Sequence, residues 1–311
     1  MDLTKPYAVV VGGVNMDICA KSFAPLIEAD SNPGTISYSV GGVGRNIAHN
    51  MALLGMKVTM LTAFGTDEYG REIERYCDKA GIDLSYALRV EDIKTSTYLY
   101  IAEPDGEMAL AVSDMAVCDR ITPDYLASHL DVINGAELVV LDANISAESM
   151  KYIASVCRVP VFCDPVSTTK AEKTRGILGS IHTFKPNRQE AETLSGIRIR
   201  NTEDALRAGE TLRAMGVGRV FISMGENGVC AVTERGSEVI PSYVVHMVNT
   251  TGCGDAFTAG LAWACINNMD LDRTAAAGIA AASVAMETMS TINTGLCEEI
   301  VRERMEHIHE S

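Results

Sequence analysis

The sequence predicts an α/β protein: a mostly parallel sheet covered by helices, with a few extra strands that form a small lid. Short β-branched runs typical of buried strands alternate with helical patterns along the 311 residues. Such alternation predicts parallel strands joined through helices. A few strand-like segments break the rhythm, and no Pro- or Ser-rich linker divides the chain. We therefore expect one domain over residues 1–311, with lid strands at about 15–40 and 95–114.

The elements are expected in the following order. The strands of the main sheet are Tyr7–Gly12, Lys57–Ala63, Leu138–Asp142, Pro160–Asp164 and Arg219–Ser223. The helices are Asn46–Leu54, Tyr69–Ala80, Ala147–Val156, Arg188–Ser195, Thr202–Met215, Ala256–Ile266 and Thr274–Met289. The lid strands are Thr35–Val40, Thr95–Ala102 and Glu107–Val112, the last two joined around the turn signal Pro104-Asp105-Gly106.

Composition excludes several classes of protein. The 26 basic and 41 acidic residues give a net charge of −15, which argues against binding of a nucleic acid polymer. It does not exclude a small anionic ligand, because backbone N–H groups can bind phosphate. Nine cysteines without a CxxC pair indicate reduced thiols. The N-terminal residues contain no secretory apolar segment, and no apolar run is long enough for a membrane span, so we expect a cytoplasmic protein.

The strongest motif is the glycine-rich turn Asn249-Thr-Thr-Gly-Cys-Gly-Asp255, which leads into an expected helix. Gly252 and Gly254 allow a sharp turn that exposes backbone N–H groups at a helix N-terminus, where partial positive charge stabilises a phosphoryl group. Asp255 follows directly, and a carboxylate there can accept the proton of an attacking hydroxyl. Taken alone, the motif is equally compatible with an ordinary turn capped by Asp.

A second glycine-rich turn, Gly41-Gly-Val-Gly-Arg-Asn-Ile-Ala48, also leads into a helix. Its glycines let a ligand approach the backbone, and Asn46 offers a donor and an acceptor to a hydroxyl. Asn15 and Asp17 follow the first strand, and ligands of open α/β sheets bind beyond the carboxyl ends of the strands. An aspartate there can hold two neighbouring sugar hydroxyls, although a capped turn would contain the same residues.

Together the two turns resemble the paired signatures of the ribokinase/PfkB family of carbohydrate kinases. The segment Gly41–Ala48, with Gly55 and Gly65 behind it, is similar to the N-terminal signature, and Asn249–Asp255 with Ala259-Gly260 is similar to the C-terminal one. Both occur in the family's order, and the resemblance covers essentially the whole chain. It implies the ribokinase-like three-layer fold with a β-strand lid, ATP as phosphoryl donor, and Mg²⁺.

The resemblance also implies roles for individual residues. Asp255 matches the family's catalytic base. The family's anion hole corresponds to Gly252, Cys253 and Gly254. The sugar-binding positions of the family correspond to Asp17, Gly42 and Asn46.

Two further segments match nucleotide and metal positions. Asn187-Arg-Gln-Glu190 matches the N-x-x-E motif that organises magnesium and phosphate, and its i, i+3 spacing places both ends on one helical face. The segment from Ser223 through Gly225 to Gly228 is similar to the part of the family that contacts the nucleotide. Without the resemblance, the first would be interpreted as a helix-capping pair and the second as a hairpin turn.

Two positions depart from the family pattern. The second signature begins with Asn249 where the family often has Asp at a position that commonly helps form a monovalent-cation site, which argues against K⁺ as a cofactor. Cys253 replaces the usual Ala. A small thiol can keep the turn and is not expected to be a nucleophile, although its place beside the anion hole could lower its pKa and makes it a candidate for alkylation. Family membership makes a homodimer plausible, through lid strands with exposed edges.

Four segments are similar to the pseudouridine kinases within this family: Ala29–Gly34, Gly41–Asn46, Cys163–Ser167 with Lys170, and His182–Asn187. This similarity implies transfer of the γ-phosphoryl group of ATP to the 5′-hydroxyl of pseudouridine. The residues expected to bind the nucleoside are Asn15, Asp17, Asp30, Ser31, Gly41, Gly42, Arg45, Asn46, Asn144 and Lys170. Asn32 would add a polar contact to uracil. Tyr98 or Tyr100 could provide an apolar wall, although packing within the lid is the favoured interpretation of both. Arg45 could hold a phosphate or could simply support the turn.

Three alternatives are considered. Another kinase of the family would act on ribose, fructose or a purine nucleoside. A nicotinamide-dependent oxidoreductase would need G-x-G-x-x-G after the first strand, where the sequence has Gly12-Gly-Val-Asn-Met-Asp17, and no P-loop motif occurs. A catalytically silent nucleoside-binding module has no need of Asp255 and Glu190 beside two glycine turns.

Overall fold

The computed structural model describes residues 6–243 and 245–310 and has the predicted α/β architecture, with a nine-stranded central sheet. Its strands are β1 Ala8–Val11, β4 Val58–Leu61, β6 Ile82–Asp83, β10 Leu138–Asp142, β11 Val161–Asp164, β12 Thr183–Phe184, β13 Arg219–Ser223, β14 Val229–Thr233 and β15 Gly236–Ile240. The order across the sheet is β15-β14-β13-β12-β11-β10-β1-β4-β6. All neighbours are parallel except β14, which is antiparallel to both β13 and β15.

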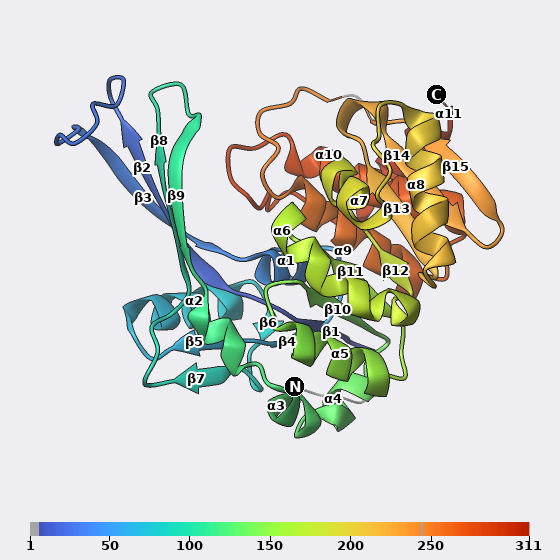
Figure 1. Cartoon of the computed structure of the whole chain (residues 1–311), viewed down its shortest axis with the longest axis horizontal. Coiled ribbons are helices and arrows are strands. Elements are labelled where there is room, and N and C mark those ends of the chain that lie inside the picture. The colour runs from blue at the N-terminus through green and yellow to red at the C-terminus, as the bar shows by residue number, and fades with distance from the viewer. Residues whose placement is uncertain (1–5, 244, 311) are drawn as a thin grey trace.

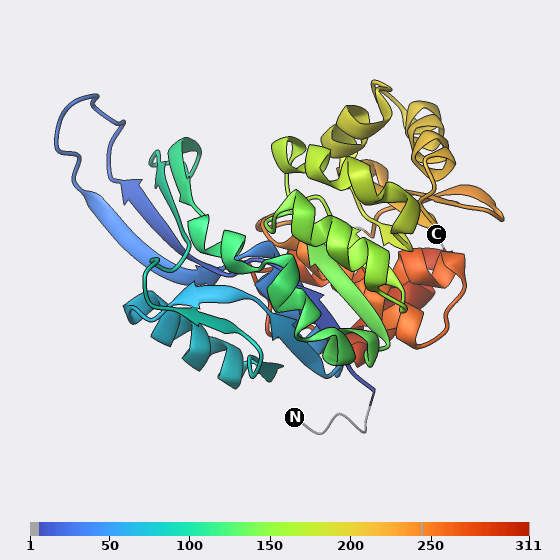
Figure 2. The same ribbon diagram turned by 60° about the horizontal axis from the view of Figure 1, so that its bottom comes forward.

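Helices cover both faces of this sheet and enclose two hydrophobic cores (Figures 1 and 2). On one face lie α1 Val43–Leu53, α2 Glu68–Lys79, α9 Cys253–Ile266, α10 Leu271–Ala285 and α11 Glu298–Glu310. On the other lie α3 Pro123–Ala127, α4 Leu130–Asn134, α5 Ala147–Val156, α6 Thr168–Ala171, α7 Arg188–Ser195 and α8 Thr202–Ala214. Successive side chains of β1 alternate between the cores, because strand residues point to opposite faces in turn. Short 3₁₀ segments occupy Ala116–Arg120, Glu172–Ser180 and Gly225–Asn227.

The small residues of α9 and α10 let these two helices pack unusually closely. A Cβ atom on Gly260 would lie 2.5 Å from the carbonyl oxygen of Ala277, and one on Gly278 would lie 2.9 Å from the Phe257 ring. Both distances are too short for real side chains, so larger residues would separate the helices. This packing fixes the position of the N-terminus of α9, where Asp255 lies.

The expected lid strands form a separate four-stranded sheet of order β3-β2-β8-β9, which projects from the body (Figure 1). Its strands are β2 Asn15–Ser22, β3 Gly34–Gly41, β8 Thr97–Ala102 and β9 Met108–Asp114. A two-stranded sheet of β5 Ala63–Gly65 and β7 Leu88–Val90 lies below it. Because β1 leads almost directly into β2, and β3 into α1, the lid is joined to the carboxyl end of the central sheet.

Many expected boundaries differ from the structure by one to three residues, and three differences are larger. The run expected as one strand at 57–63 divides into β4 and β5. The helix expected at Thr274–Met289 is shifted to Leu271–Ala285, because the Asp270 side chain accepts the Arg273 N–H and begins the helix earlier. The hairpin of β14 and β15 was not predicted. Within the described ranges, every helix is too short or too polar to cross a bilayer.

Candidate active site

Most of the predicted site residues converge at the carboxyl ends of the parallel strands. The predicted Ser223 ends β13, and two further polar residues, Asp142 and Asp164, end β10 and β11. Helices α1 and α9, which follow the two glycine-rich turns, pack against each other in the same region. Two motifs some 200 residues apart in sequence therefore meet at one edge of the sheet, as ligand sites of open α/β folds require.

The contact that joins the two motifs is a hydrogen bond from Asn46 to Asp255. The Nδ2 atom of Asn46 lies 2.7 Å from Oδ2 of Asp255, and both side chains are buried. The Oδ1 atom of Asn46 is also buried and has no hydrogen-bond partner among the described residues. Since an unpaired buried acceptor is costly, this oxygen is well placed to accept a bond from a ligand hydroxyl beside Asp255.

A cluster of buried charges surrounds the Asp255 carboxylate. Lys185 lies just after β12, and its Nζ atom forms an ion pair of 2.8 Å with Oδ2 of Asp164. The two side chains are only 7% and 4% exposed. Burial and the negative charge of Asp164 raise the pKa of Asp255 to about 7, although the bond from Asn46 opposes the shift. A carboxylate with a pKa near the working pH has the basicity that a general base needs.

The lysine of this cluster stays charged despite its burial. Burial alone would lower the pKa of Lys185, but the charges of Asp164 and Glu190 outweigh it, and the pKa is raised. Burial also raises the pKa of Glu190. The Nζ atom of Lys185 lies 3.5 Å from the carbonyl oxygen of Gly254, which places the cation directly beneath the anion-hole turn.

The predicted anion hole is the N-terminus of α9. Gly252 adopts a left-handed conformation with φ of 82°, and a Cβ atom there would lie 2.2 Å from the carbonyl oxygen of Thr291, so only glycine fits. The first intrahelical bond runs from Ala256 N–H to Gly252. The N–H groups of Gly254 and Asp255 precede that bond and are available to an anion.

The candidate lowering of the Cys253 thiol pKa is wrong. Burial and the nearby charge of Asp255 raise the pKa of Cys253 to about 11, so the thiol is protonated at neutral pH. The sequence argument considered the helix N-terminus but not the burial of the side chain. Asn249, at the start of the turn, uses its amide to bond Met289 O at 3.1 Å and to accept the Thr251 N–H at 3.1 Å. It contributes no negative charge to a cation site.

On the acceptor side, the β2–β3 ladder positions Asp17. Asn15 donates to Asp17 across 2.6 Å, and burial raises the pKa of Asp17. Gly41 lies opposite Asn15 in the ladder, and a Cβ atom there would lie 2.1 Å from Oδ2 of Asp17. Gly42 has a φ of 99°, and a Cβ atom at this position would lie only 2.7 Å from the Cα atom of Val14. The glycines therefore make room for the carboxylate and for close backbone approach.

Arg45 supports the turn, the alternative role considered for it. Its guanidinium is fully buried, donates to the carbonyl oxygens of Val40 and Gly41, and lies 5.0 Å from the centre of the Tyr76 ring. Its Nη1 atom has no partner among the described residues. Burial lowers the pKa of Arg45, which the nearby carboxylates of Asp17 and Asp255 partly offset.

Asn144 and Lys170 belong to a network beneath the acceptor site. Lys170 Nζ donates to Asn144 Oδ1 at 2.5 Å, and Asn144 Nδ2 donates to Asp142 at 2.9 Å. Asp142 also accepts the backbone N–H groups of Gly13 and Gly44, at 2.9 and 2.7 Å. This buried carboxylate thus ties the end of β1 to the second glycine turn.

Sequence reasoning did not single out Asp142, Asp164 or Lys185 as site residues. A usable signal was present, because both aspartates end apolar strands, where an acidic residue has no packing role. Lys185 occupies the same edge after β12. In a parallel sheet these positions lie side by side. A search for charges at the ends of the expected strands would have found both aspartates but not Lys185, because no strand was expected at 183–184.

Three of the four predicted nucleotide residues line one pocket of about 190 Å³ beside the anion hole, and Asn187 does not. Ser223, Gly225 and Gly228 form its polar side, and Cys253 and Gly254 connect it to the N-terminus of α9. The remaining walls are largely apolar and include Val229, Tyr243, Phe257, Ile279, Ala282 and Met286. Such a slot, with a polar rim that leads to exposed N–H groups, has the shape and chemistry of a site for a flat heteroaromatic base with a phosphate chain.

The N-x-x-E residues form a capping box at the start of α7. Glu190 N–H donates to Asn187 Oδ1 at 3.0 Å, and Asn187 N–H donates to Glu190 Oε2 at 2.8 Å. The capping interpretation of the motif is therefore correct. Only the Oε2 atom of Glu190 takes part in this box. The described residues contain no cluster of three or more potential metal ligands.

Asp30 and Ser31 are not brought to the site. They lie in the connection between β2 and β3, at the outer end of the lid (Figure 1), and both are exposed. Asp30 accepts the Ser31 N–H at 2.7 Å, and Asn32 uses its amide to bond Ile27, so these side chains hold the loop itself. Tyr98 and Tyr100 are nearer, because the register of β2 and β8 places Tyr98 beside Asp17 on one face of the lid.

Comparison with known proteins agrees with this geometry. The pattern of the pfkB family carbohydrate kinases matches residues 5–297. The chain is 40% identical over 294 residues to the pseudouridine kinase of Escherichia coli K12, covering 94% of each chain, and 27% identical to the guanosine-inosine kinase of Exiguobacterium acetylicum, covering 94% and 97%. The structure of Arabidopsis thaliana ribokinase complexed with ribose and ATP superposes with a TM-score of 0.87 at 23% identity, over 97% and 99% of the chains. The protein therefore belongs to the pfkB family of carbohydrate kinases.

Proposed function

We propose that this kinase transfers the γ-phosphoryl group of Mg-ATP to the 5′-hydroxyl of pseudouridine, giving pseudouridine 5′-phosphate and ADP. The observation that carries the proposal is the contact of Asn46 with Asp255. It joins the predicted sugar-binding turn to a buried carboxylate with a pKa of about 7, next to free N–H groups at a helix N-terminus.

The residues divide the reaction between them. Asp255 would accept the proton of the attacking 5′-hydroxyl, while the Gly254 and Asp255 N–H groups stabilise charge on the transferring phosphoryl group. Asn46 and Asp17 would hold the ribose. The buried Lys185 adds positive charge beneath the same turn. In-line attack requires the 5′-oxygen and the leaving oxygen of ADP on opposite sides of the γ-phosphorus, so the acceptor would approach from the side of Asn46 and ADP would leave toward the side of Gly228.

ATP and Mg²⁺ fit the residues on the nucleotide side. The apolar pocket between Phe257 and Ile279 suits a purine, and its opening at Gly254 leads a phosphate chain to the helix N-terminus. Bound magnesium would neutralise phosphate charge, with Glu190 orienting its water shell. Closure of the lid over the acceptor would exclude water and protect ATP from hydrolysis.

The choice of acceptor rests on the similarity to pseudouridine kinase. On the polar face of the lid, Tyr98 and Tyr100 lie with ring centres 5.9 Å apart, next to Asp17 along the ladder. They offer an apolar wall to a base attached to the ribose. A free sugar such as ribose or fructose would leave that wall unused, and a purine nucleoside would need more space against it.

The first test is a coupled assay of ADP release with Mg-ATP and pseudouridine, uridine, guanosine, inosine, adenosine, ribose or fructose. We expect kcat/KM for pseudouridine to exceed that for every other acceptor by at least about tenfold, the margin of one well-made polar contact. Faster turnover of a purine nucleoside would retain a nucleoside kinase and reject pseudouridine, and faster turnover of a free sugar would retain the kinase and reject the nucleoside assignment. Absence of turnover with all of them would favour a silent binding module.

We further propose that the lid mediates a homodimer through its apolar face rather than through its edges. Ile36, Tyr38, Leu99, Leu110 and Val112 are all exposed. The strand register places them on one face, opposite to that of Asp17. A contiguous exposed apolar face of this kind is typical of a protein–protein contact. A second lid of the same chain would complement it.

The oligomeric state tests this directly. By sedimentation velocity, we expect the wild type to be dimeric and Ile36→Glu/Leu110→Glu to be monomeric, because two charges would be buried at the contact. The matched control is Ser37→Glu/Ser113→Glu, which adds the same charges to the other face and should remain dimeric. A monomeric wild type, or an equal effect of both double variants, would refute the proposed interface.

A further inference from the structure

A large pocket of about 500 Å³ lies at the opposite end of the central sheet from the candidate active site. Of the residues that line it, His182 immediately precedes β12 and Arg219 is the first residue of β13. Ser223, which lines the nucleotide pocket, is the last residue of β13. Four residue steps along the strand place the two pockets ~13 Å apart. This pocket therefore contributes nothing to the phosphoryl transfer described above, and its contents require a separate explanation.

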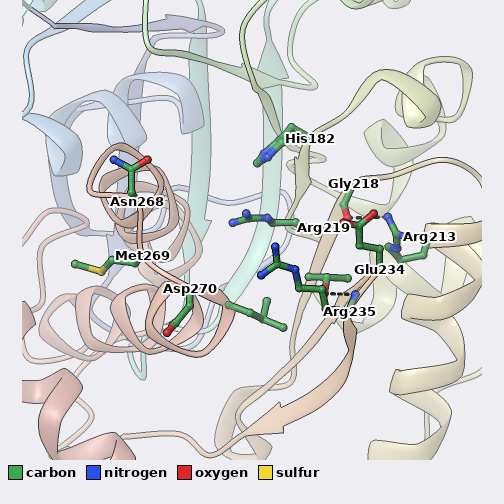
Figure 3. Close-up of a pocket in the computed structure, with 11 residues that line it drawn as sticks. His182, Arg213, Gly218, Arg219, Glu234, Arg235, Asn268, Met269 and Asp270 are labelled. Atoms are coloured by element: carbon green, nitrogen blue, oxygen red, sulfur yellow. Dashed lines mark hydrogen bonds between the residues drawn. The ribbon is translucent and has the colours of Figure 1, made fainter.

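Three arginines line this pocket in a chain of net charge −15. None of Arg213, Arg219 and Arg235 forms an ion pair with any residue in the ranges 6–243 and 245–308. Arg213 is fixed by bonds of 2.8 Å to the carbonyl oxygens of Val217 and Gly218. The other two guanidinium groups have no hydrogen-bond acceptor in the same ranges, and Figure 3 shows them extending into the same space.

The acidic residues of the pocket do not neutralise these cations. The carboxylate of Asp270 caps α10 by accepting the Arg273 N–H at 3.0 Å. Glu234 is exposed and, within the described chain, makes no ion pair with the arginines. Two unpaired guanidinium groups that share a cavity repel each other, and a bound dianion would remove that repulsion.

The chemistry of the cavity identifies the class of ligand. Planar guanidinium groups bind phosphate through paired hydrogen bonds, and two of them match the charge of a phosphate monoester. A volume of about 500 Å³ is in the range of pockets for small organic molecules and exceeds the needs of a phosphate ion. Met269 and Leu271 provide an apolar wall on the side formed by the connection between α9 and α10.

We propose that this pocket binds a phosphorylated small molecule, with its phosphate between Arg219 and Arg235 and its organic part against Met269 and Leu271. The site is separate from both substrate sites. It depends on no metal ion, and it requires no covalent change in the protein.

Isothermal titration calorimetry tests the proposal on the whole protein, already saturated with Mg²⁺ and a non-hydrolysable ATP analogue. The probes are ribose 5-phosphate and uridine 5′-monophosphate. Inorganic phosphate is titrated in parallel to show whether the organic part of the ligand contributes to binding. We expect at least one organic phosphate to bind. The double variant Arg219→Gln/Arg235→Gln should weaken that binding at least tenfold. The control Arg158→Gln/Arg198→Gln removes the same charge at exposed positions outside the pocket and should bind as the wild type does.

Each outcome decides the proposal. Tighter binding of an organic phosphate than of inorganic phosphate, lost only in the pocket variant, supports it. Equally tight binding of inorganic phosphate would overturn the proposal that the ligand has an organic part. Binding that the pocket variant leaves unchanged, or no binding of any probe, would overturn the site. Unaltered kcat and melting temperature in both double variants would show that neither change disturbs the fold or the active site.

Discussion

Asp255→Asn should lower kcat about 10²–10⁴-fold, the usual contribution of a positioned general base. The substitution keeps the size of the side chain and an oxygen that can accept the 2.7 Å bond from Asn46, so the geometry of the site is preserved. Only the capacity to take the proton is lost. The measurement is steady-state kinetics with Mg-ATP and the preferred acceptor. A variant that retains more than a tenth of wild-type kcat would show that Asp255 is not the base.

The pH profile provides an independent test of the same residue. Because the pKa of Asp255 is raised to about 7, the base is protonated below that pH, and kcat/KM should fall tenfold per pH unit on the acidic side and reach a plateau above it. A profile flat between pH 5.5 and 8 would contradict this assignment of the pKa.

Stability should change in the opposite direction to activity. Asp255 has a higher pKa in the folded protein, about 7, than in the unfolded chain. Its ionisation therefore destabilises the fold once the pH exceeds the pKa of the unfolded chain, and this cost grows with pH up to about pH 7. Asp255→Asn removes that cost, so the variant should be more stable than the wild type at pH 8, by ~2–4 kcal/mol, and by clearly less at pH 5. Urea unfolding at the two pH values measures this difference, and it also shows that the loss of activity does not come from unfolding.

The sequence predicted the central sheet and lid well because their signals are local. Ala147–Val156, Arg188–Ser195 and Leu138–Asp142 have the predicted bounds, since each combines a clear periodicity with a capping or strand-ending residue. Glycine turns identified both halves of the site because their backbone requirement is visible in sequence. Gly252 and Gly42, for example, have positive φ values that other residues rarely adopt.

What the sequence did not reveal depends on contacts between distant segments. The ion pair of Asp164 with Lys185 needs two strands to be neighbours, and nothing local marks it. The pKa of Cys253 was predicted in the wrong direction, because burial by surrounding helices outweighs the helix N-terminus. Asp30 and Ser31 were placed at the acceptor by similarity alone, whereas the length of β2 and β3 carries them to the outer end of the lid.

Lys185→Met should destabilise the protein by ~3–5 kcal/mol, because it leaves the buried carboxylate of Asp164 without its partner. The two side chains are 7% and 4% exposed, so water cannot replace the lost charge. The positive charge of Lys185 also lowers the pKa of Asp255. Its removal should raise that pKa, so that the decline of kcat/KM on the acidic side (the acidic limb of the pH profile) begins above pH 7. Urea unfolding and the pH dependence of kcat/KM measure the two effects separately.

The double variant Asp164→Asn/Lys185→Met distinguishes an unpaired charge from a simple packing defect. If the single variant is unstable because Asp164 is left charged and alone, neutralising that residue should restore most of the lost stability. It should also return the acidic limb toward lower pH, since Asp164 is the charge that raises the pKa of Asp255. A double variant no more stable than Lys185→Met would mean that the aliphatic stem of Lys185, and not its charge, supports the turn at Gly254.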